Sequence, residues 1–270
     1  MTRLLTAAFL IPAAWYLCKR APLGLFLAAA LLFAAVAAWE CVGILKQRGS
    51  RPFTGISVAA CVGLVGAFAL QPPLSVAVAV LTAAVLLSQA TAMARRPTPE
   101  AMFDAAMTTC VPVFVVGLPF AFVVGLRAIP GENGPDLLLL AMLCVTLSDA
   151  GAYYAGSAFG THRLAPVISP KKSWEGVAGG VLGSVVGALI GHFWFFQRLP
   201  LVHALALGVV LCAAGIVGDL AESMLKRSAG VKDSSTLLPG HGGVLDRVDS
   251  LLVAAPVLYY YWSFFPAGAR

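Results

Sequence analysis

The sequence predicts an all-α protein, a polytopic integral membrane helical bundle of about nine transmembrane helices. Of its 270 residues, 60% are hydrophobic and only 11% are charged, and the mean hydropathy is +0.89. A soluble domain needs more polar surface than this to stay dispersed in water. The apolar residues also form runs that are long enough to cross a bilayer, with short polar segments between them.

The apolar runs give the expected helices in chain order, since a spanning helix needs roughly 20 apolar residues. The first run follows Arg3 like a signal peptide, but a second run begins directly after Lys19 and Arg20, so we expect a retained helix. Pro72 and Pro73 form a turn between the third and fourth runs. The predicted spans are residues 4–18, 22–40, 55–71, 74–93, 105–126, 136–158, 176–196, 201–221 and 245–264.

The chain contains no convincing internal repeat, flexible linker or second soluble segment. We therefore predict one integral-membrane domain over residues 1–270, with N-terminal membrane helices in 1–130 and a C-terminal half in 136–264. Two long polar loops, 159–175 and 222–247, belong to the C-terminal half, and most candidate functional residues lie in or beside them.

The distribution of basic residues predicts the orientation in the membrane, because Lys and Arg accumulate in cytoplasmic loops. With the N-terminus inside, 13 of the 18 Lys and Arg residues lie on the inner side. We expect a multi-pass protein of a bacterial-type inner or plasma membrane, with its C-terminus outside. Both polar loops would then lie in the cytoplasm, where they could face one another.

The basic excess, 18 Lys and Arg against 12 Asp and Glu, does not indicate a nucleic-acid partner. No basic run with interleaved aromatic residues is present, and anionic lipid headgroups or phosphorylated substrates explain the charge better. The six cysteines stand singly, without the spacing of a zinc site or a disulfide framework.

Charged residues are concentrated between Asp219 and Asp249. Asp219 directly follows an apolar run, where an ionisable side chain is costly unless it is paired or bound to a metal. Glu222, Ser223, Lys226 and Arg227 follow at helical spacing and share one side of the predicted helix. For Glu222, an ordinary surface pair with Lys226 is an equally good interpretation.

A glycine-rich turn, Gly240-His241-Gly242-Gly243, comes next and could direct backbone N–H groups toward an anion, although membrane re-entrant turns look similar. Asp246 and Asp249 then open the last apolar run on one helix face. Carboxylates from two helix ends suit Mg²⁺ with substrate phosphates completing its coordination. Four cations would neutralise a triphosphate: Lys226, Arg227, Lys232 and Arg247.

Two upstream elements also indicate function. Asp149 lies within an apolar span, which favours a functional role, with a hydrogen bond to a neighbouring helix as the alternative. Lys171 and Lys172 precede a predicted helix start, which is a favourable position for an anion. The helix after them carries a stripe of small residues that predicts close helix packing, with a homodimer through the same stripe as the alternative. The stripe is Gly179, Gly180, Gly183, Gly187 and Gly191.

These residues resemble the phosphatidate cytidylyltransferase family, the integral-membrane CDP-diacylglycerol synthases. The matching pattern is Ser223-x-x-Lys226-Arg227, Lys232-Asp233 and His241-Gly242-Gly243-x-x-Asp246-Arg247-x-Asp249. The segments Ser148–Gly160 and Ser169–Gly176 are similar to family features too, with Ser173 in place of the more usual Thr. The motifs cover about the C-terminal half of the chain.

The resemblance implies a Mg²⁺-dependent reaction, with or without a second metal ion, in which CTP and phosphatidate give CDP-diacylglycerol and pyrophosphate. It implies catalytic roles for Asp219, Ser223, Lys226 and Asp246. The implied metal ligands are Asp219 and Asp246 first, then Asp249 and Asp149. The residues expected to bind substrate are Lys171, Lys172, Arg227, Lys232, His241, Gly242, Gly243 and Arg247.

Three alternatives to this activity remain open from the sequence. A CTP-dependent lipid kinase, or a cytidylyltransferase acting on another lipid phosphate, would use the same metal and phosphate groups. A cation-coupled transporter would also bury aspartates among glycine-rich helices, but it gives no reason for the basic loop.

Overall fold

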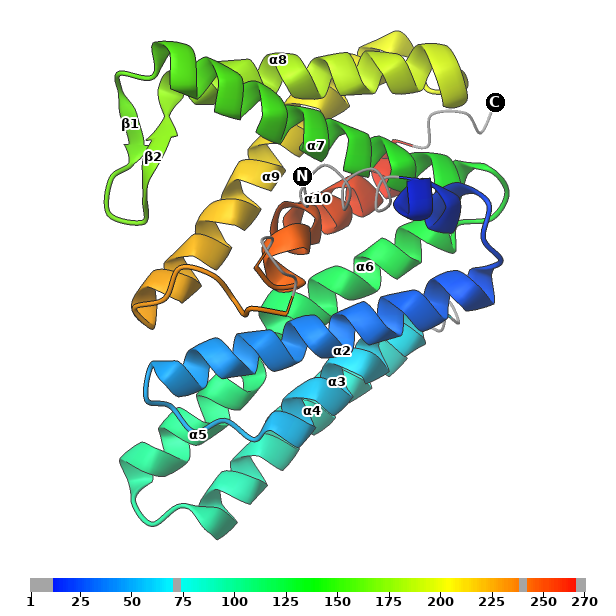
Figure 1. Cartoon of the computed structure of the whole chain (residues 1–270). Coiled ribbons are helices and arrows are strands. Elements are labelled where there is room, and N and C mark those ends of the chain that lie inside the picture. Colours follow the sequence, from blue (N-terminus) through cyan, green and yellow to red (C-terminus); the bar gives the residue numbers. More distant parts are fainter. Residues whose placement is uncertain (1–11, 70–73, 238–241, 266–270) are drawn as a thin grey trace. The chain divides into compact units, whose positions relative to one another are not determined.

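The computed structural model describes residues 12–69, 74–237 and 242–265, and most of these are helical (Figure 1). This confirms the predicted all-α fold. The chain divides into two compact units. Unit 1 contains the described residues up to Ala128 together with Leu225–Val248, and unit 2 contains Ile129–Met224 and the described residues from Asp249 onward. The prediction of a single membrane domain stays a prediction.

Unit 1 is built on α2 (Leu23–Gln47), α3 (Thr54–Ala69) and α4 (Leu74–Arg95), with α2 packed on α3 and α3 on α4 (Figure 1). Their buried faces consist largely of Ala, Cys, Val and Leu, and the many alanines among them allow close packing.

A long bent helix completes the membrane part of unit 1. It begins with α5 (Pro99–Pro112), passes through a π-helical turn, η1 (Val113–Gly117), and continues as α6 (Leu118–Arg127). Pro112 lacks the N–H that an α-helical hydrogen bond needs, and the π-turn follows directly after it. A Cβ on Gly117 would lie 2.8 Å from the Cα of Cys61, so this glycine lets the turn approach α3.

Unit 2 begins with α7 (Asn133–Phe159) and a short antiparallel hairpin of β1 (Arg163–Ala165) and β2 (Ser169–Ser173) (Figure 1). Next come α8 (Trp174–Ile190) and a second π-turn, η2 (Gly191–Phe195). Two further helices, α9 (Leu201–Ser228) and α10 (Leu245–Phe264), lie mostly in unit 2, and the end of α9 and the start of α10 belong to unit 1.

The glycine stripe of α8 packs against α7. A Cβ on Gly179 would meet the backbone oxygen of Gly151, and one on Gly183 would meet that of Leu147. Two helix backbones can approach this closely only where side chains are absent. The helix-packing interpretation of the stripe is therefore confirmed within the chain, and a homodimer stays a prediction.

Six described helical segments are long and apolar enough to cross a membrane: Leu23–Gln47, Ser75–Arg95, Pro99–Arg127, Asn133–Phe159, Trp174–Phe195 and Leu201–Ser228. Within the same described residues, α3 is shorter and α10 begins with three charged residues, and neither belongs to these six. Six such helices fit a multi-pass membrane protein, and the orientation stays a prediction.

Several predicted boundaries differ from the structure by a few residues, among them the start of the span 105–126, where the helix begins at Pro99. The span 22–40 ends too early, because α2 continues to Gln47 and carries Glu40 in its interior. The span 201–221 likewise extends to Ser228, so part of the predicted 222–247 loop is helical. The 159–175 loop contains the hairpin, which lacks the apolar alternation that reveals strands in a sequence. Of the span 4–18, only the part from residue 12 lies within the described residues, and it is helical.

Candidate functional site

A cavity of about 460 Å³ lies in unit 2 between the end of α7, the β1–β2 hairpin, the start of α8 and α9. This is a usual volume for a small-molecule site. Three cationic and two anionic side chains contribute to its lining: Arg163, Lys171, Lys172, Asp149 and Asp219. Four of these five were predicted from the sequence, and Arg163 was not. The lining of this cavity therefore supplies both cationic side chains and carboxylates.

The hairpin that carries the three cations is fixed at its base. The Ser173 hydroxyl accepts a hydrogen bond from the Gly176 N–H at 3.1 Å, which caps the N-terminus of α8. The Glu175 carboxylate accepts from the hydroxyl of Thr161 at 2.7 Å and from the backbone N–H of His162 at 3.2 Å. The Glu175 bonds connect the start of α8 to the residues between α7 and β1, so both ends of the hairpin are held in place.

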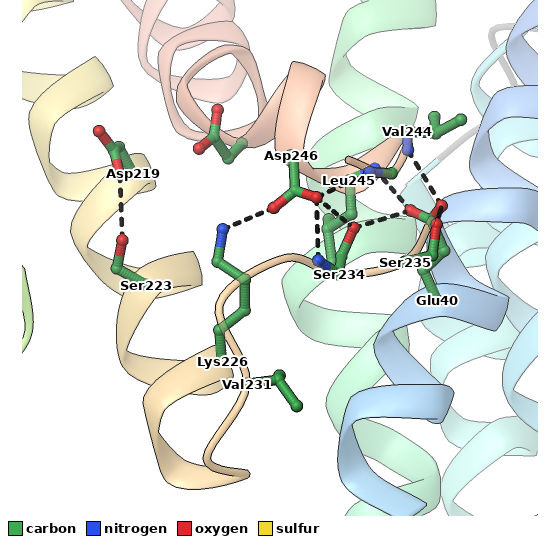
Figure 2. Close-up of polar contacts among 12 residues, drawn as sticks. Glu40, Asp219, Ser223, Lys226, Val231, Ser234, Ser235, Val244, Leu245 and Asp246 are labelled. Carbon is green, nitrogen blue, oxygen red and sulfur yellow. Dashed lines mark hydrogen bonds and ion pairs between the residues drawn. The ribbon is translucent and has the colours of Figure 1, made fainter. Parts of the chain in front are cut away.

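Asp219 forms an ion pair and accepts a hydrogen bond in this cavity. Its Oδ2 lies 2.6 Å from Nζ of Lys172. Its Oδ1 accepts a hydrogen bond from the Ser223 hydroxyl at 3.2 Å, which Figure 2 shows. The Lys172 and Asp219 side chains are 24% and 34% exposed, so solvent and a ligand can reach the pair. The Asp219 carboxylate is thus already paired with the ammonium group of Lys172.

The residues present are compatible with Mg²⁺. No group of three His, Cys, Asp or Glu side chains close enough to hold a metal occurs among the described residues. However, Mg²⁺ is commonly bound by one or two carboxylates while substrate phosphates and water complete its coordination. Asp149 and Asp219 line the same cavity and supply that number of carboxylates.

The motif residues of unit 1 surround a second carboxylate, Asp246 (Figure 2). Its Oδ1 accepts from Nζ of Lys226 at 2.6 Å. Its Oδ2 accepts from the Ser234 N–H at 2.9 Å, the Ser234 hydroxyl at 2.8 Å and the Gly243 N–H at 2.8 Å. Both side chains of the ion pair are buried, 10% exposed for Lys226 and 6% for Asp246.

These bonds keep Asp246 ionised. Asp246 lies in the first turn of α10, outside the six membrane-length helices. Burial alone would raise the pKa of its carboxyl, but the hydrogen bonds from Lys226, Gly243 and Ser234 outweigh burial and hold the pKa well below its usual range. Asp246 is therefore an anion at neutral pH.

Sequence reasoning did not identify Glu40, which is joined to this cluster. Glu40 is only 1% exposed, and its carboxylate accepts hydrogen bonds from Ser235, Val244 and Leu245 (Figure 2). One signal could have revealed it, because an ionisable residue in an otherwise apolar helix needs a partner. The predicted span 22–40 ended at this residue, which hid the signal.

The other predicted cations of unit 1 are exposed: Arg227, Lys232 and Arg247. The guanidinium of Arg227 donates to the Val231 carbonyl at 2.9 Å, which closes the turn after α9. Gly242 has a φ of +75°, which glycine adopts without strain. His241 lies outside the described residues. Phosphate binding by these residues stays a prediction.

Two further acidic residues that the sequence analysis considered, Glu222 and Asp249, belong to unit 2. Glu222 is 4% exposed, so its interpretation as a member of a surface pair is wrong. Asp249 is half-buried, and its backbone oxygen lies 2.5 Å from the position of a Cβ on Gly218. The absence of that Cβ lets α10 pack directly beside Asp219 on α9. The predicted convergence of Asp219 and Asp246 joins residues of different units and stays a prediction.

A model of the cytidylyltransferase family matches residues 1–265 of the chain. The chain is 47% identical over 138 residues to a phosphatidate cytidylyltransferase of Haemophilus influenzae. The matched region covers 49% of this chain and 47% of that protein. It is 52% identical over 133 residues to one of Pseudomonas aeruginosa, covering 49% and 48%. A third, of Mycobacterium bovis, is 38% identical over 151 residues, covering 56% and 49%. The chain spans about half the length of these relatives in the matched regions.

Proposed function

Because this chain belongs to the cytidylyltransferase family, we propose that it transfers the cytidylyl group of CTP to phosphatidate, giving CDP-diacylglycerol and pyrophosphate for phospholipid biosynthesis. The names of the three relatives support phosphatidate as the acceptor. The observation that carries the proposal is the unit 2 cavity, in which three cations and two carboxylates line a space of about 460 Å³. A nucleoside triphosphate with a divalent cation needs both kinds of group.

In the proposed reaction, an oxygen of the phosphatidate phosphate attacks the α-phosphorus of CTP in line with the leaving group. A new P–O bond forms, the bond from the α-phosphorus to the bridging oxygen breaks, and its electron pair leaves with pyrophosphate. A phosphate monoester has a second pKa near 6 and is largely ionised at neutral pH, so the attack requires little help from a base. The protein therefore contributes mainly positioning and electrostatic stabilisation.

The cationic side chains of the cavity would provide this positioning and electrostatic stabilisation. Lys171, Lys172 and Arg163 line one space, where they would bind the phosphate oxygens of CTP and stabilise the charge that develops on pyrophosphate. Lys172 is paired with Asp219, and a phosphate that competes for this lysine would leave the Asp219 carboxylate available to a metal ion.

We propose Mg²⁺ as the cofactor, held by Asp149 and Asp219 in this cavity, with Asp246 and Asp249 as further candidate ligands. When bound, the ion would neutralise triphosphate charge and orient the α-phosphate for attack. For membrane orientation, we keep the N-terminus inside, which gives the cavity access to cytoplasmic CTP.

The test uses purified protein in phosphatidate-containing micelles, with CTP labelled at either the α- or the γ-phosphorus and Mg²⁺ titrated from zero. Label from the α-position in the lipid product, dependent on Mg²⁺, supports the proposal. Transfer of the γ-label alone would mean that the protein is a lipid kinase. Absence of both labels from lipid, with each substrate shown to bind, would reject nucleotidyl transfer.

A further inference from the structure

Glu40 is a buried acid in the C-terminal half of a membrane-length helix. It lies in α2 between Trp39 and Cys41 and is 1% exposed, and α2 is one of the six apolar segments. A carboxylate in such a place is costly unless charge or hydrogen bonds compensate for the lost water. Its conformation is therefore determined by the groups that donate to it.

Four hydrogen bonds provide this compensation (Figure 2). Oε1 accepts from the Ser235 hydroxyl at 2.6 Å and from the Val244 N–H at 3.0 Å. Oε2 accepts from the Leu245 N–H at 2.7 Å, and it shares the hydroxyl proton of Ser234, at 3.2 Å, with the Asp246 carboxylate. Two carboxylate oxygens have about four acceptor positions, so three of them have a donor of their own and the fourth has the donor that is shared with Asp246.

These donors belong to the two ends of the segment that carries the motif. Ser234 and Ser235 lie shortly after α9, whereas Val244 and Leu245 lie at the start of α10. Glu40 is 194 to 205 residues away from them in sequence. One side chain of α2 thus joins both ends of the loop and occupies the N-terminus of α10, where backbone N–H groups favour an anion.

The same loop residues hold Asp246. Ser234 donates to Asp246 through its N–H and its hydroxyl, and the Gly243 N–H donates as well. A Cβ on Gly243 would collide with Oε1 of Glu40 and with the Ser234 hydroxyl, so the Glu40 carboxylate fills the space beside this glycine. Three of the four hydrogen bonds to Asp246 therefore come from residues that Glu40 holds in place or packs against.

We propose that Glu40 is a positioning residue for the reaction. By holding both ends of the 234–245 loop, it fixes the direction of the Asp246 carboxylate and, through that carboxylate, the ammonium of Lys226. This inference rests on the proposed function, because it assigns the Asp246–Lys226 pair to cytidylyl transfer. Glu40 contacts neither CTP nor phosphatidate in this role.

The test is Glu40→Gln in the full-length protein. Glutamine keeps the size of the side chain, but its amide nitrogen cannot accept, so one pair of loop donors loses its acceptor. We expect kcat per folded molecule to fall at least tenfold, with the KM for CTP unchanged within about threefold, because catalytic groups are displaced while the unit 2 cavity is intact.

Asp136→Asn is the matched control. Asp136 is also a buried acid, 5% exposed in the first turn of α7, and it lies outside both carboxylate clusters of the site. This variant should lower thermal stability and leave kcat per folded molecule within twofold of the wild-type value. The comparison separates the general cost of replacing a buried acid from a specific effect on catalysis.

The outcomes separate this inference from the proposed function. If the wild-type protein forms no CDP-lipid, the proposed function fails. If the wild-type protein is active and Glu40→Gln keeps its kcat within twofold, or changes only the KM for CTP, Glu40 does not position catalytic groups. If Glu40→Gln does not fold, Ser235→Ala takes its place, since it removes one of the four donors. A fall of about threefold in its kcat supports the inference, and an unchanged kcat overturns it.

Discussion

Two ion pairs of equal length should differ greatly in their contribution to stability. Lys226–Asp246 and Lys172–Asp219 both have an N–O distance of 2.6 Å. The side chains of the first pair are 10% and 6% exposed, whereas those of the second are 24% and 34% exposed. Replacing Asp246 or Asp219 by Asn keeps the size of each side chain and removes its charge, so burial is the main variable in the comparison.

The expected magnitudes follow from that difference. Asp246→Asn leaves a buried ammonium beside a neutral amide, and breaking a buried pair from one side costs about 3–5 kcal/mol. At roughly 2–4 °C per kcal/mol for a large domain, Tm should fall by about 6–20 °C. Asp219→Asn removes a solvent-accessible pair worth about 0–1 kcal/mol, so its Tm should fall by no more than about 4 °C.

The six cysteines provide the assay. All six are free and buried, so a dye that reacts with thiols reports unfolding as temperature rises in detergent. Equal Tm losses in Asp246→Asn and Asp219→Asn would refute the reasoning, because burial would then not decide the cost. A larger loss of Tm in Asp219→Asn would show that the Lys172–Asp219 pair contributes more to stability than the Lys226–Asp246 pair.

Three further predictions address catalysis, packing and pH. Asp219→Asn should lower turnover by orders of magnitude while Tm changes little, measured as CDP-lipid formed per folded molecule; near-normal turnover would remove Asp219 from the metal site. Gly183→Ala should cost about 1–3 kcal/mol by overpacking against a backbone carbonyl of α7, whereas Gly43→Ala, with nothing within 4 Å, should not lower Tm. The pKa of Asp246 is lower in the folded than in the unfolded state, where it is near 3.9, so its stabilisation is present above that pH and lost as pH falls toward the folded pKa. The Tm of the wild-type protein should therefore fall more steeply below about pH 4 than that of Asp246→Asn, and parallel curves would contradict the shift.

Much of the candidate site could be predicted from the sequence, because its residues are unusual in their local setting. Asp149 and Asp219 are noticeable as acids next to apolar runs, and Lys171 and Lys172 as cations before a helix. The cavity that brings these four residues together depends on the hairpin, whose strands of three and five residues are too short for a periodic signal.

The pairing of charges could not be predicted in the same way. From the sequence, a surface pair of Glu222 and Lys226 was as good an interpretation as a functional role, because the two residues are four positions apart. In the structure, Glu222 is buried and Lys226 donates to Asp246, twenty residues further on. Spacing along one helix shows which residues share a face, but it does not show what that face packs against.

The sequence by itself determined the helices, the membrane class and the residue types of the site, because hydropathy and motif spacing are local properties of the chain. The tertiary structure alone decided which buried charges have which partners. Glu40 shows the reason: its four donors lie 194 to 205 residues away, and an acid in an apolar helix is stabilised only by groups that folding brings to it.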